Sequence, residues 1–315
     1  MKISFFLQRR FAYIGHAMAS HIQTQWPGTQ FSAIVQMRQG YDFLVAQKDI
    51  PYHSLILDED IFQKIRHEKV DPAYIDWLES EYGIPNLWPY LYIDRVVMNG
   101  QLVREYPHHT PILSHEEMLA CVQVYAKEII AFLDRERPDA VVLSVVGCVS
   151  ALLLYHIARK RGIQTINIEF ARIGNRIVYS EDYRTLSWVK ERFLAIQAGR
   201  ISTAQNEAIA FLETFRKQPA PYDADYMQEF YAKKGRLSAL SFLRPKKLLR
   251  SIPWHIGTFF HDLRRARNPD YTDIFIWWSL FDKLKRKFRS FIGFSDLYDA
   301  PDFSISFAYV PLHIE

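Results

Sequence analysis

The chain has 315 residues, of which 49% are hydrophobic and 23% are charged. This composition excludes a disordered or fibrous chain, and the length allows two domains of ordinary size. The two cysteines, Cys121 and Cys148, sit among apolar residues and indicate reduced core thiols rather than a disulfide scaffold. Because the first residues also lack the apolar run and cleavage site of a signal peptide, the sequence predicts a cytoplasmic protein.

The net charge of +4 is distributed unevenly. Residues 236–292 hold thirteen Lys/Arg against four Asp, so the rest of the chain is net negative. Aromatic residues interleave with these basic residues, a pattern that suits peripheral contact with an anionic membrane surface. Aromatic packing beneath a solvated basic face explains the pattern equally well. The segment carries no helix-turn-helix, zinc-finger or RNA-binding signature, so nucleic acid is not an expected partner.

Apolar periodicity predicts alternating strands and helices from the amino terminus. Strands are expected at residues 2–7, 31–35 and 54–57, and helices follow the first two, one ending before Pro27 and one over 37–48. This alternation predicts a Rossmann-like α/β fold, with a parallel sheet and flanking helices.

Helices are expected next. Residues 59–106 are helical and rich in aromatic residues, and a capping box at Ser114 and Glu117 opens a long helix that ends near Arg137. Residues 139–144 then form a strand, 149–161 a helix and 163–168 a strand, which together predict a right-handed β-α-β unit at about 137–184.

Two other interpretations of this unit are weaker. Residues 140–158 carry no charge and approach the length of a membrane span, but Gly147 and internal polar residues favour a strand, a turn and a helix. The turn has one glycine and lacks the G-x-G-x-x-G fingerprint of dinucleotide binding.

The carboxyl-terminal part is predicted to be mostly helical. One or two helices are expected over 184–217, a rigid break over 218–222, and a basic aromatic helical segment over 236–292. A linker at Pro301 precedes a predicted strand that ends at Val310. In an α/β fold a helix is expected after such a strand, and here that helix is missing.

Open α/β sheets bind ligands at the carboxyl ends of their strands. Arg9 and Arg10 follow the first strand and are candidates to hold a phosphate or carboxylate, and His16 is a candidate general base. A solvated loop and a surface histidine are the alternative. Residues 144–150 follow a later strand and present backbone amides in a turn.

A second group of candidates follows the strand at 163–168. Four polar residues lie close together in the sequence after this strand: Glu169, Arg172, Asn175 and Arg176. A carboxylate beside arginines is either a catalytic base or an ion pair that orders a loop, and the ion pair is the commoner case.

Residues 58–60, Asp-Glu-Asp, match the D-x-D pattern of metal-dependent sugar transferases. The same pattern recurs at Asp223 and Asp225, and three acidic residues before a helix are also an ordinary complement to its dipole. No metal site is therefore predicted, although a metal-dependent transferase that uses Asp58 and Asp60 stays open.

Three stretches carry a resemblance to a known family: residues 82–88 with Asp94 and Arg95, residues 169–182, and residues 307–315. In these stretches the chain resembles bacterial capsular-polysaccharide biosynthesis proteins, which look like glycosyltransferases of the two-Rossmann-domain (GT-B) architecture. The resemblance implies an acceptor-side domain at 1–235, a helical linker at 236–300 and the start of a truncated donor domain at 301–315.

The resemblance also implies a reaction, the transfer of sugar from a nucleotide-sugar to a polysaccharide or lipid-linked acceptor, without another cofactor. Glu169 and His16 are then the candidate bases. The implied substrate-binding residues are Arg9, Arg10, Arg172, Asn175, Arg176, His313 and Glu315. A non-catalytic binding or assembly protein of the capsule machinery, with the same fold, is the alternative.

Overall fold

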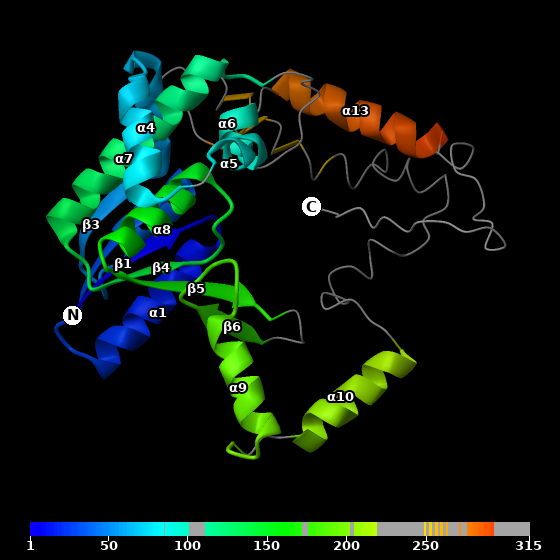
Figure 1. The fold of residues 1–315 in the computed structure, drawn as a ribbon. Coiled ribbons are helices and arrows are strands. Elements are labelled where there is room, and N and C mark those ends of the chain that lie inside the picture. Colours follow the sequence, from blue (N-terminus) through cyan, green and yellow to red (C-terminus); the bar gives the residue numbers. More distant parts are fainter. Residues whose placement is uncertain are drawn as a thin grey trace, which may run out of the picture. The chain divides into compact units, whose positions relative to one another are not determined.

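The computed structural model describes most of the amino-terminal two thirds of the chain (Figure 1). The described residues are 1–84, 86–100, 111–171, 176–201, 205–218, 249, 252–253, 256–257, 259–260, 263, 271 and 276–292. The strand predicted before Val310 and the residues His313 and Glu315 lie outside them.

The strands form one sheet of six, in the order β3-β2-β1-β4-β5-β6. Their bounds are Lys2–Leu7 (β1), Gln30–Val35 (β2), Tyr52–Leu57 (β3), Ala140–Leu143 (β4), Gln164–Phe170 (β5) and Ile177–Ser180 (β6). Neighbouring strands from β3 to β5 pair in parallel, and β6 pairs with β5 antiparallel. The Rossmann-like parallel sheet predicted from the sequence is confirmed.

Some of the helices pack on the two faces of this sheet (Figure 1), and the helices as a whole are as follows. In the amino-terminal half they are α1 (Phe11–Gln25), α2 (Arg38–Ala46), α3 (Asp58–Gln63), the 3-10 turn Lys64–His67, α4 (Pro72–Tyr82), α5 (Trp88–Ile93), α6 (Arg95–Asn99) and α7 (His115–Glu136). Those that follow are α8 (Val149–Lys160), α9 (Ser187–Gln197), α10 (Gln205–Lys217) and α13 (Ile276–Ile292). Among the described residues, no helix is both long and apolar enough to cross a bilayer.

Alternation along the strands supplies two apolar faces. Phe6, Ile34 and Leu143 point to the face that packs against α7 and α8. Phe5 and Val35 point to the opposite face, where they pack with residues of α1 and α2. Successive side chains of a strand point to opposite faces, so a sheet covered on both sides needs apolar residues at nearly every position.

The predicted β-α-β unit is present as β4, α8 and β5. Gly162 follows α8 in the left-handed conformation (φ +71°), as expected of a glycine that ends a helix. The uncharged stretch 140–158 is therefore a strand, a turn and most of a helix, and its strand pairs with β1 and β5.

The chain divides into two compact units. The first comprises Met1–Phe230 with Arg265–Asp273, and the second comprises Tyr231–Arg264 with Ile274–Glu315. Tyr271, which lies inside the predicted linker, thus belongs with the sheet. The three-part division at residues 235 and 300 stays a prediction.

One buried carboxylate joins two helices of the first unit. Asp94, 5% exposed, accepts hydrogen bonds at Oδ1 from the amides of Val96 (2.8 Å) and Val97 (3.3 Å) at the start of α6. Its Oδ2 accepts from the amide of Val149 (2.8 Å), the first residue of α8. Burial raises the pKa of Asp94, and the three amide hydrogen bonds oppose that rise.

Replacing this carboxylate should destabilise the fold. Asp94→Ala leaves three buried amides without an acceptor, so we expect it to lower the free energy of unfolding by roughly 2–4 kcal/mol. Urea denaturation followed by circular dichroism measures this change. Asp71→Ala is the matched control, because Asp71 caps α4 at the surface through one amide, that of Ala73. It should cost about 1 kcal/mol. Equal losses in the two variants would contradict the role of Asp94.

Candidate ligand site at the carboxyl ends of the strands

The strand order reverses between β1 and β4. From β1 the chain continues to β2 and β3 on one side, whereas β4 leads to β5 and β6 on the other. The loops that leave β1 and β4 therefore diverge, and open α/β sheets bind ligands in the crevice that such a divergence creates. This position is the first place to look for a site.

A hydrogen-bonded group of side chains links these two loops. Gln8, after β1, accepts a hydrogen bond from the Ser144 hydroxyl (3.0 Å) and donates one to the sulfur of Cys148 (3.2 Å). Gln36, after β2, also approaches that sulfur (3.8 Å). Burial raises the pKa of Cys148 to about 12, so its thiol is neutral and acts as a structural group rather than as a nucleophile.

Two arginines lie near this group. Arg9 follows β1 with a left-handed backbone (φ +43°), a strained conformation for a residue other than glycine. Burial lowers the pKa of the Arg9 guanidinium, and the positive charge of Arg95 lowers it further. Arg95 follows Asp94, which is bonded to the start of α8. The switch point therefore gathers two positive charges, although Arg9 itself is an exposed residue.

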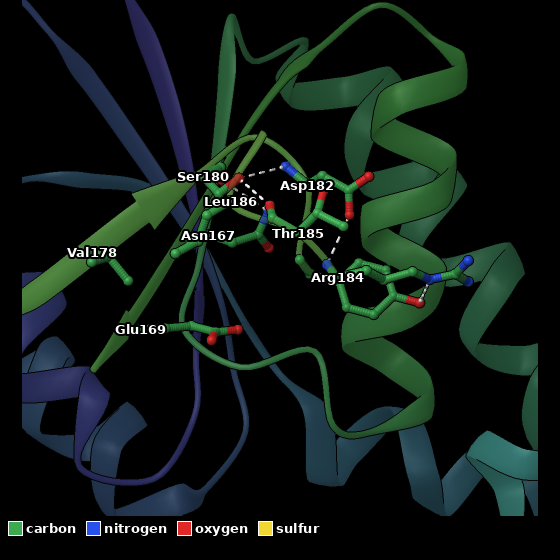
Figure 2. A pocket seen from close by; sticks show the side chains of 9 residues that line it. Asn167, Glu169, Val178, Ser180, Asp182, Arg184, Thr185 and Leu186 are labelled. Atoms are coloured by element: carbon green, nitrogen blue, oxygen red, sulfur yellow. Dashed lines mark hydrogen bonds between the residues drawn. The ribbon is translucent and has the colours of Figure 1, made fainter. Parts of the chain in front are cut away.

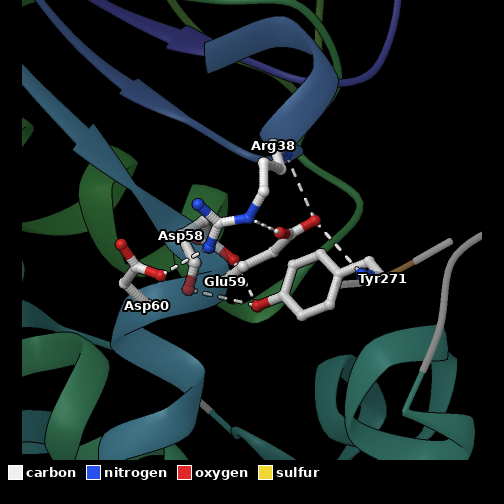
Figure 3. A network of polar contacts seen from close by, with 5 residues as sticks. All are labelled: Arg38, Asp58, Glu59, Asp60 and Tyr271. Carbon is white, nitrogen blue, oxygen red and sulfur yellow. Dashed lines mark hydrogen bonds and ion pairs between the residues drawn. The ribbon is translucent and has the colours of Figure 1, made fainter. Parts of the chain in front are cut away.

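Two buried carboxylates at the end of β3 and the two tyrosines that contact them form a cluster that we call the acid socket: Asp58, Glu59, Tyr125 and Tyr271. Figure 3 shows this cluster without Tyr125. The Asp58 Oδ2 atom accepts from the hydroxyls of Tyr125 and Tyr271, each at 2.9 Å. The backbone amide of Tyr271 donates to Glu59 Oε1 (3.1 Å). Tyr271 is 2% exposed, so it seals a pair of buried carboxylates.

The carboxyl of Asp58 holds its proton unusually well. Burial raises its pKa to about 6, although the hydrogen bonds from Tyr125 and Tyr271 act in the opposite direction. Its Oδ1 atom has no hydrogen-bond partner among the described residues. A buried charge without full hydrogen bonding is costly, which explains why the neutral form persists to a higher pH.

The three acidic residues of the D-x-D pattern point to different partners. Asp58 faces the two tyrosines, whereas Asp60 is exposed and pairs with Arg38 (2.8 Å; Figure 3). Glu59 accepts a hydrogen bond from the Arg38 amide (3.2 Å). In the part of the chain that the structure describes, no three His, Cys, Asp or Glu side chains gather as metal ligands.

His16 lies in a packed environment away from the switch point. Its Nδ1 atom is 3.2 Å from the hydroxyl of Tyr52, and its Nε2 atom is 3.3 Å from Asp49 Oδ1. Tyr52 begins β3, so these partners mark the amino end of that strand. Gly15 beside it serves packing, because a Cβ there would lie 2.4 Å from a methyl carbon of Leu7. The role of His16 as a base stays a prediction.

The expected strand exit at Glu169 is wrong, because β5 continues through Phe170. Glu169 pairs with Val178 and Phe170 with Ile177 in an antiparallel hairpin, and this pairing extends the strand by two residues. The hairpin was missed because the polar run from Arg172 to Arg176 resembles a loop at the end of a strand. Arg176 is exposed and directly precedes β6, while Arg172 and Asn175 lie outside the described residues.

Glu169 lines a small hollow beside this hairpin, with a volume of about 60 Å³. Figure 2 shows the glutamate apart from a hydrogen-bonded group around Ser180, whose hydroxyl donates to the Thr185 carbonyl (2.6 Å). Asn167 donates to the Ser180 carbonyl (3.2 Å). A water molecule takes about 30 Å³, so the hollow alone is too small for a sugar-nucleotide.

Tyr271 and the roles of Asp94 and Arg95 were not predicted from the sequence. Tyr271 carries no local signal, since its hydrogen-bond partners Asp58, Glu59 and Tyr125 are all distant in the sequence. Asp94 and Arg95 were noticed only as part of a resemblance. An aspartate immediately before a short helix is a recognisable cap, but the link to α8 depends on the tertiary fold.

No protein-family profile and no curated protein matches the sequence. Among solved structures, the chain is similar to a UDP-GlcNAc 2-epimerase from Neisseria meningitidis bound to UDP-GlcNAc, with 11% identity and a TM-score of 0.29. A UDP-GlcNAc 2-epimerase from Methanocaldococcus jannaschii has 15% identity and a TM-score of 0.25. Each match covers 56% of this chain and about a third (33% and 32%) of the epimerase. Likenesses this weak carry no argument about activity.

The acid socket should make stability depend on pH. The Asp58 pKa is higher in the folded chain (about 6) than its ordinary value of 3.8, so the folded state binds more protons between these values. The stabilising contribution of Asp58 is then fully present below pH 4. It is lost as the pH rises through 6, which lowers the free energy of unfolding by roughly 3 kcal/mol. Asp58→Asn removes the charge, so the variant should gain stability relative to the wild type as the pH rises from 4 to 7.

Urea denaturation at a series of pH values measures this difference. The control is Asp60→Asn, which removes an exposed carboxylate of the same helix and should leave the pH profile parallel to that of the wild type. A constant difference between Asp58→Asn and the wild type would contradict a raised pKa at Asp58.

Proposed function

We propose that this chain forms the acceptor-side half of a sugar-nucleotide-dependent glycosyltransferase that builds a capsular or other surface polysaccharide. The observation that carries the proposal is the pair of arginines at the switch point between β1 and β4. An arginine pair at the switch point of an open sheet suits an anion with several oxygens, such as the diphosphate of a nucleotide-sugar. The resemblance in residues 82–88 with Asp94 and Arg95, and in residues 169–182, supports the same class of enzyme.

In this reaction, the role of the arginines is to stabilise the leaving group. When sugar is transferred, the bond between its anomeric carbon and the diphosphate breaks, and negative charge grows on the departing oxygen. Arg9 and Arg95, with Arg10 nearby, are positioned to neutralise this charge as preorganised donors. Fixed positive side chains can do this without a bound metal. His313 and Glu315 are further candidates for this cleft through the resemblance alone.

A base must take the proton of the attacking hydroxyl. Glu169 is the better candidate, because it is exposed at the edge of a hollow, whereas His16 is a buried residue of α1 that contacts Tyr52 of β3. Arg172, Asn175 and Arg176, which follow Glu169, would contact the acceptor. A lipid-linked acceptor would place the reaction at the cytoplasmic face of the inner membrane.

A non-catalytic binding protein of the capsule machinery is the second candidate. One observation favours it: Asp94 already occupies the amide of Val149 at the start of α8. Nucleotide-binding sheets commonly hold phosphate at the start of such a helix, and here the chain's own carboxylate takes that place.

Nucleotide binding tests the arginine pair. Arg9→Gln and Arg95→Gln should each weaken the binding of UDP, measured by isothermal titration calorimetry, by roughly 10–100-fold, because each removes a charge-assisted hydrogen bond. Arg137→Gln is the control, since Arg137 precedes β4 at the opposite edge of the sheet and should leave the affinity unchanged. Unchanged UDP affinity in both Arg9 and Arg95 variants, with intact folding, would exclude the site.

Turnover separates the two candidate functions. In the full protein, Glu169→Gln should lower sugar transfer by roughly 100-fold or more, as expected for the loss of a general base, while UDP binding stays within about twofold. Hydrolysis or transfer of a radiolabelled nucleotide-sugar measures the rate. Unchanged transfer would exclude Glu169 as the base, and UDP binding without any transfer in the wild type would favour the binding protein.

A further inference from the structure

Helix α13 (Ile276–Ile292) exposes a row of large apolar side chains. Their exposed fractions are 55% for Phe281, 59% for Leu284, 66% for Phe288, 43% for Phe291 and 57% for Ile292. At 100° per residue, these five positions fall within an arc of about 100° on the helix. We call them the apolar stripe. A stripe of this width is the usual contact face of an amphipathic helix.

Basic residues border the stripe. The helix has five Lys/Arg against one Asp. By the same helical geometry, Lys285 and Arg289 border one edge of the stripe and Lys287 borders the other. Asp282 forms an ion pair with Arg286 (2.7 Å), one turn along the helix. The helix therefore carries a net charge of +4, with basic residues at both edges of the stripe.

Another exposed helix shows why this charge matters. Helix α10 also exposes Phe211, Leu212 and Phe215, yet its charged residues balance, with two Glu against one Arg and one Lys. An exposed stripe alone fits many partners. An exposed stripe with positive charge at both edges fits a partner surface that is negatively charged where it meets water and apolar beneath.

We propose that α13 is a membrane-surface helix that lies in the headgroup region of an anionic bilayer. The apolar stripe enters the acyl boundary, and Lys285, Lys287 and Arg289 reach the lipid phosphates at its edges. The helix has 17 residues and six of them are charged, so it lies on the bilayer rather than crossing it. This inference is independent of sugar transfer and holds for either candidate function.

Vesicle sedimentation of the whole chain tests the charge complementarity. The protein should pellet with vesicles that contain phosphatidylglycerol, much less with pure phosphatidylcholine, and less at high salt. Lys285→Glu/Lys287→Glu/Arg289→Glu should reduce the partition coefficient roughly tenfold or more. The matched control is Lys190→Glu/Arg192→Glu/Lys217→Glu, which reverses three exposed charges of α9 and α10 and should reduce it by less than a third of that factor. Equal pelleting of the α13 charge variant and the wild type would overturn the proposal.

The same assay tests the apolar stripe. Leu284→Ser/Phe288→Ser removes two large apolar side chains from the stripe and leaves the charge of the helix unchanged. Because membrane binding scales with buried apolar area, this variant should also partition roughly tenfold less onto the anionic vesicles. Pelleting equal to that of the wild type would overturn the proposal, since the stripe would then not enter the bilayer.

A spin-label experiment tests the orientation. Both native cysteines are buried, so a nitroxide can be placed at Phe288→Cys, within the stripe, or at Arg286→Cys, outside it. On anionic vesicles the first label should become shielded from a water-soluble relaxation agent and the second should stay accessible. Equal accessibility of the two labels would overturn the proposal.

Discussion

The hydrogen bonds of Asp94 set the geometry on which the carboxyl edge of the sheet depends. One carboxylate accepts from the first turns of α6 and α8, so it fixes the aromatic helical region against the central β-α-β unit. A carboxylate loses its hydration when it is buried, and three amides at two positive helix ends replace the lost water. Since Arg95 is the next residue, the same contact fixes where that positive charge emerges.

The carboxyl edge consequently divides into two electrostatic regions. At the end of β3, Asp58 and Glu59 are buried and covered by Tyr271 in the acid socket. At the ends of β1 and β4, Arg9 and Arg95 supply positive charge at the switch point. Burial, and in addition the charges of Asp94 and Asp58, raise the pKa of Cys148, so the negative field of the acid socket extends to the loop after β4.

The sequence predicts much of the sheet because its signal there is local. Leu143 and Ile166 lie in short runs of β-branched and leucine residues bounded by Pro138 and Gly162, and such runs identify buried strands without any tertiary information. β6 is only four residues long and follows a polar run, so its short β-branched stretch was not recognised as a strand. Tyr271 could not be assigned at all, since its burial results from contacts with residues that are distant in the sequence, such as Asp58 and Tyr125.

The candidate site was predicted in part for the same reason. Arg9 follows a strand that is recognisable by itself, so the general rule for open sheets was enough to nominate it. Glu169 was nominated by the same rule at a position where the strand had not yet ended. The rule depends on locating the end of a strand, and antiparallel pairing with a later segment moves that end without changing the local sequence.

Asp94 already accepts the hydrogen bond of the Val149 amide at the start of α8, and this limits how an anion can be held at this edge of the sheet. A helix start offers few free amides, and a carboxylate bonded to the first of them also neutralises part of the positive end of the dipole. A diphosphate at the switch point would therefore depend on side chains rather than on backbone amides. Arginine suits that role, because its planar guanidinium donates two parallel hydrogen bonds and stays charged even when burial lowers its pKa, as at Arg9.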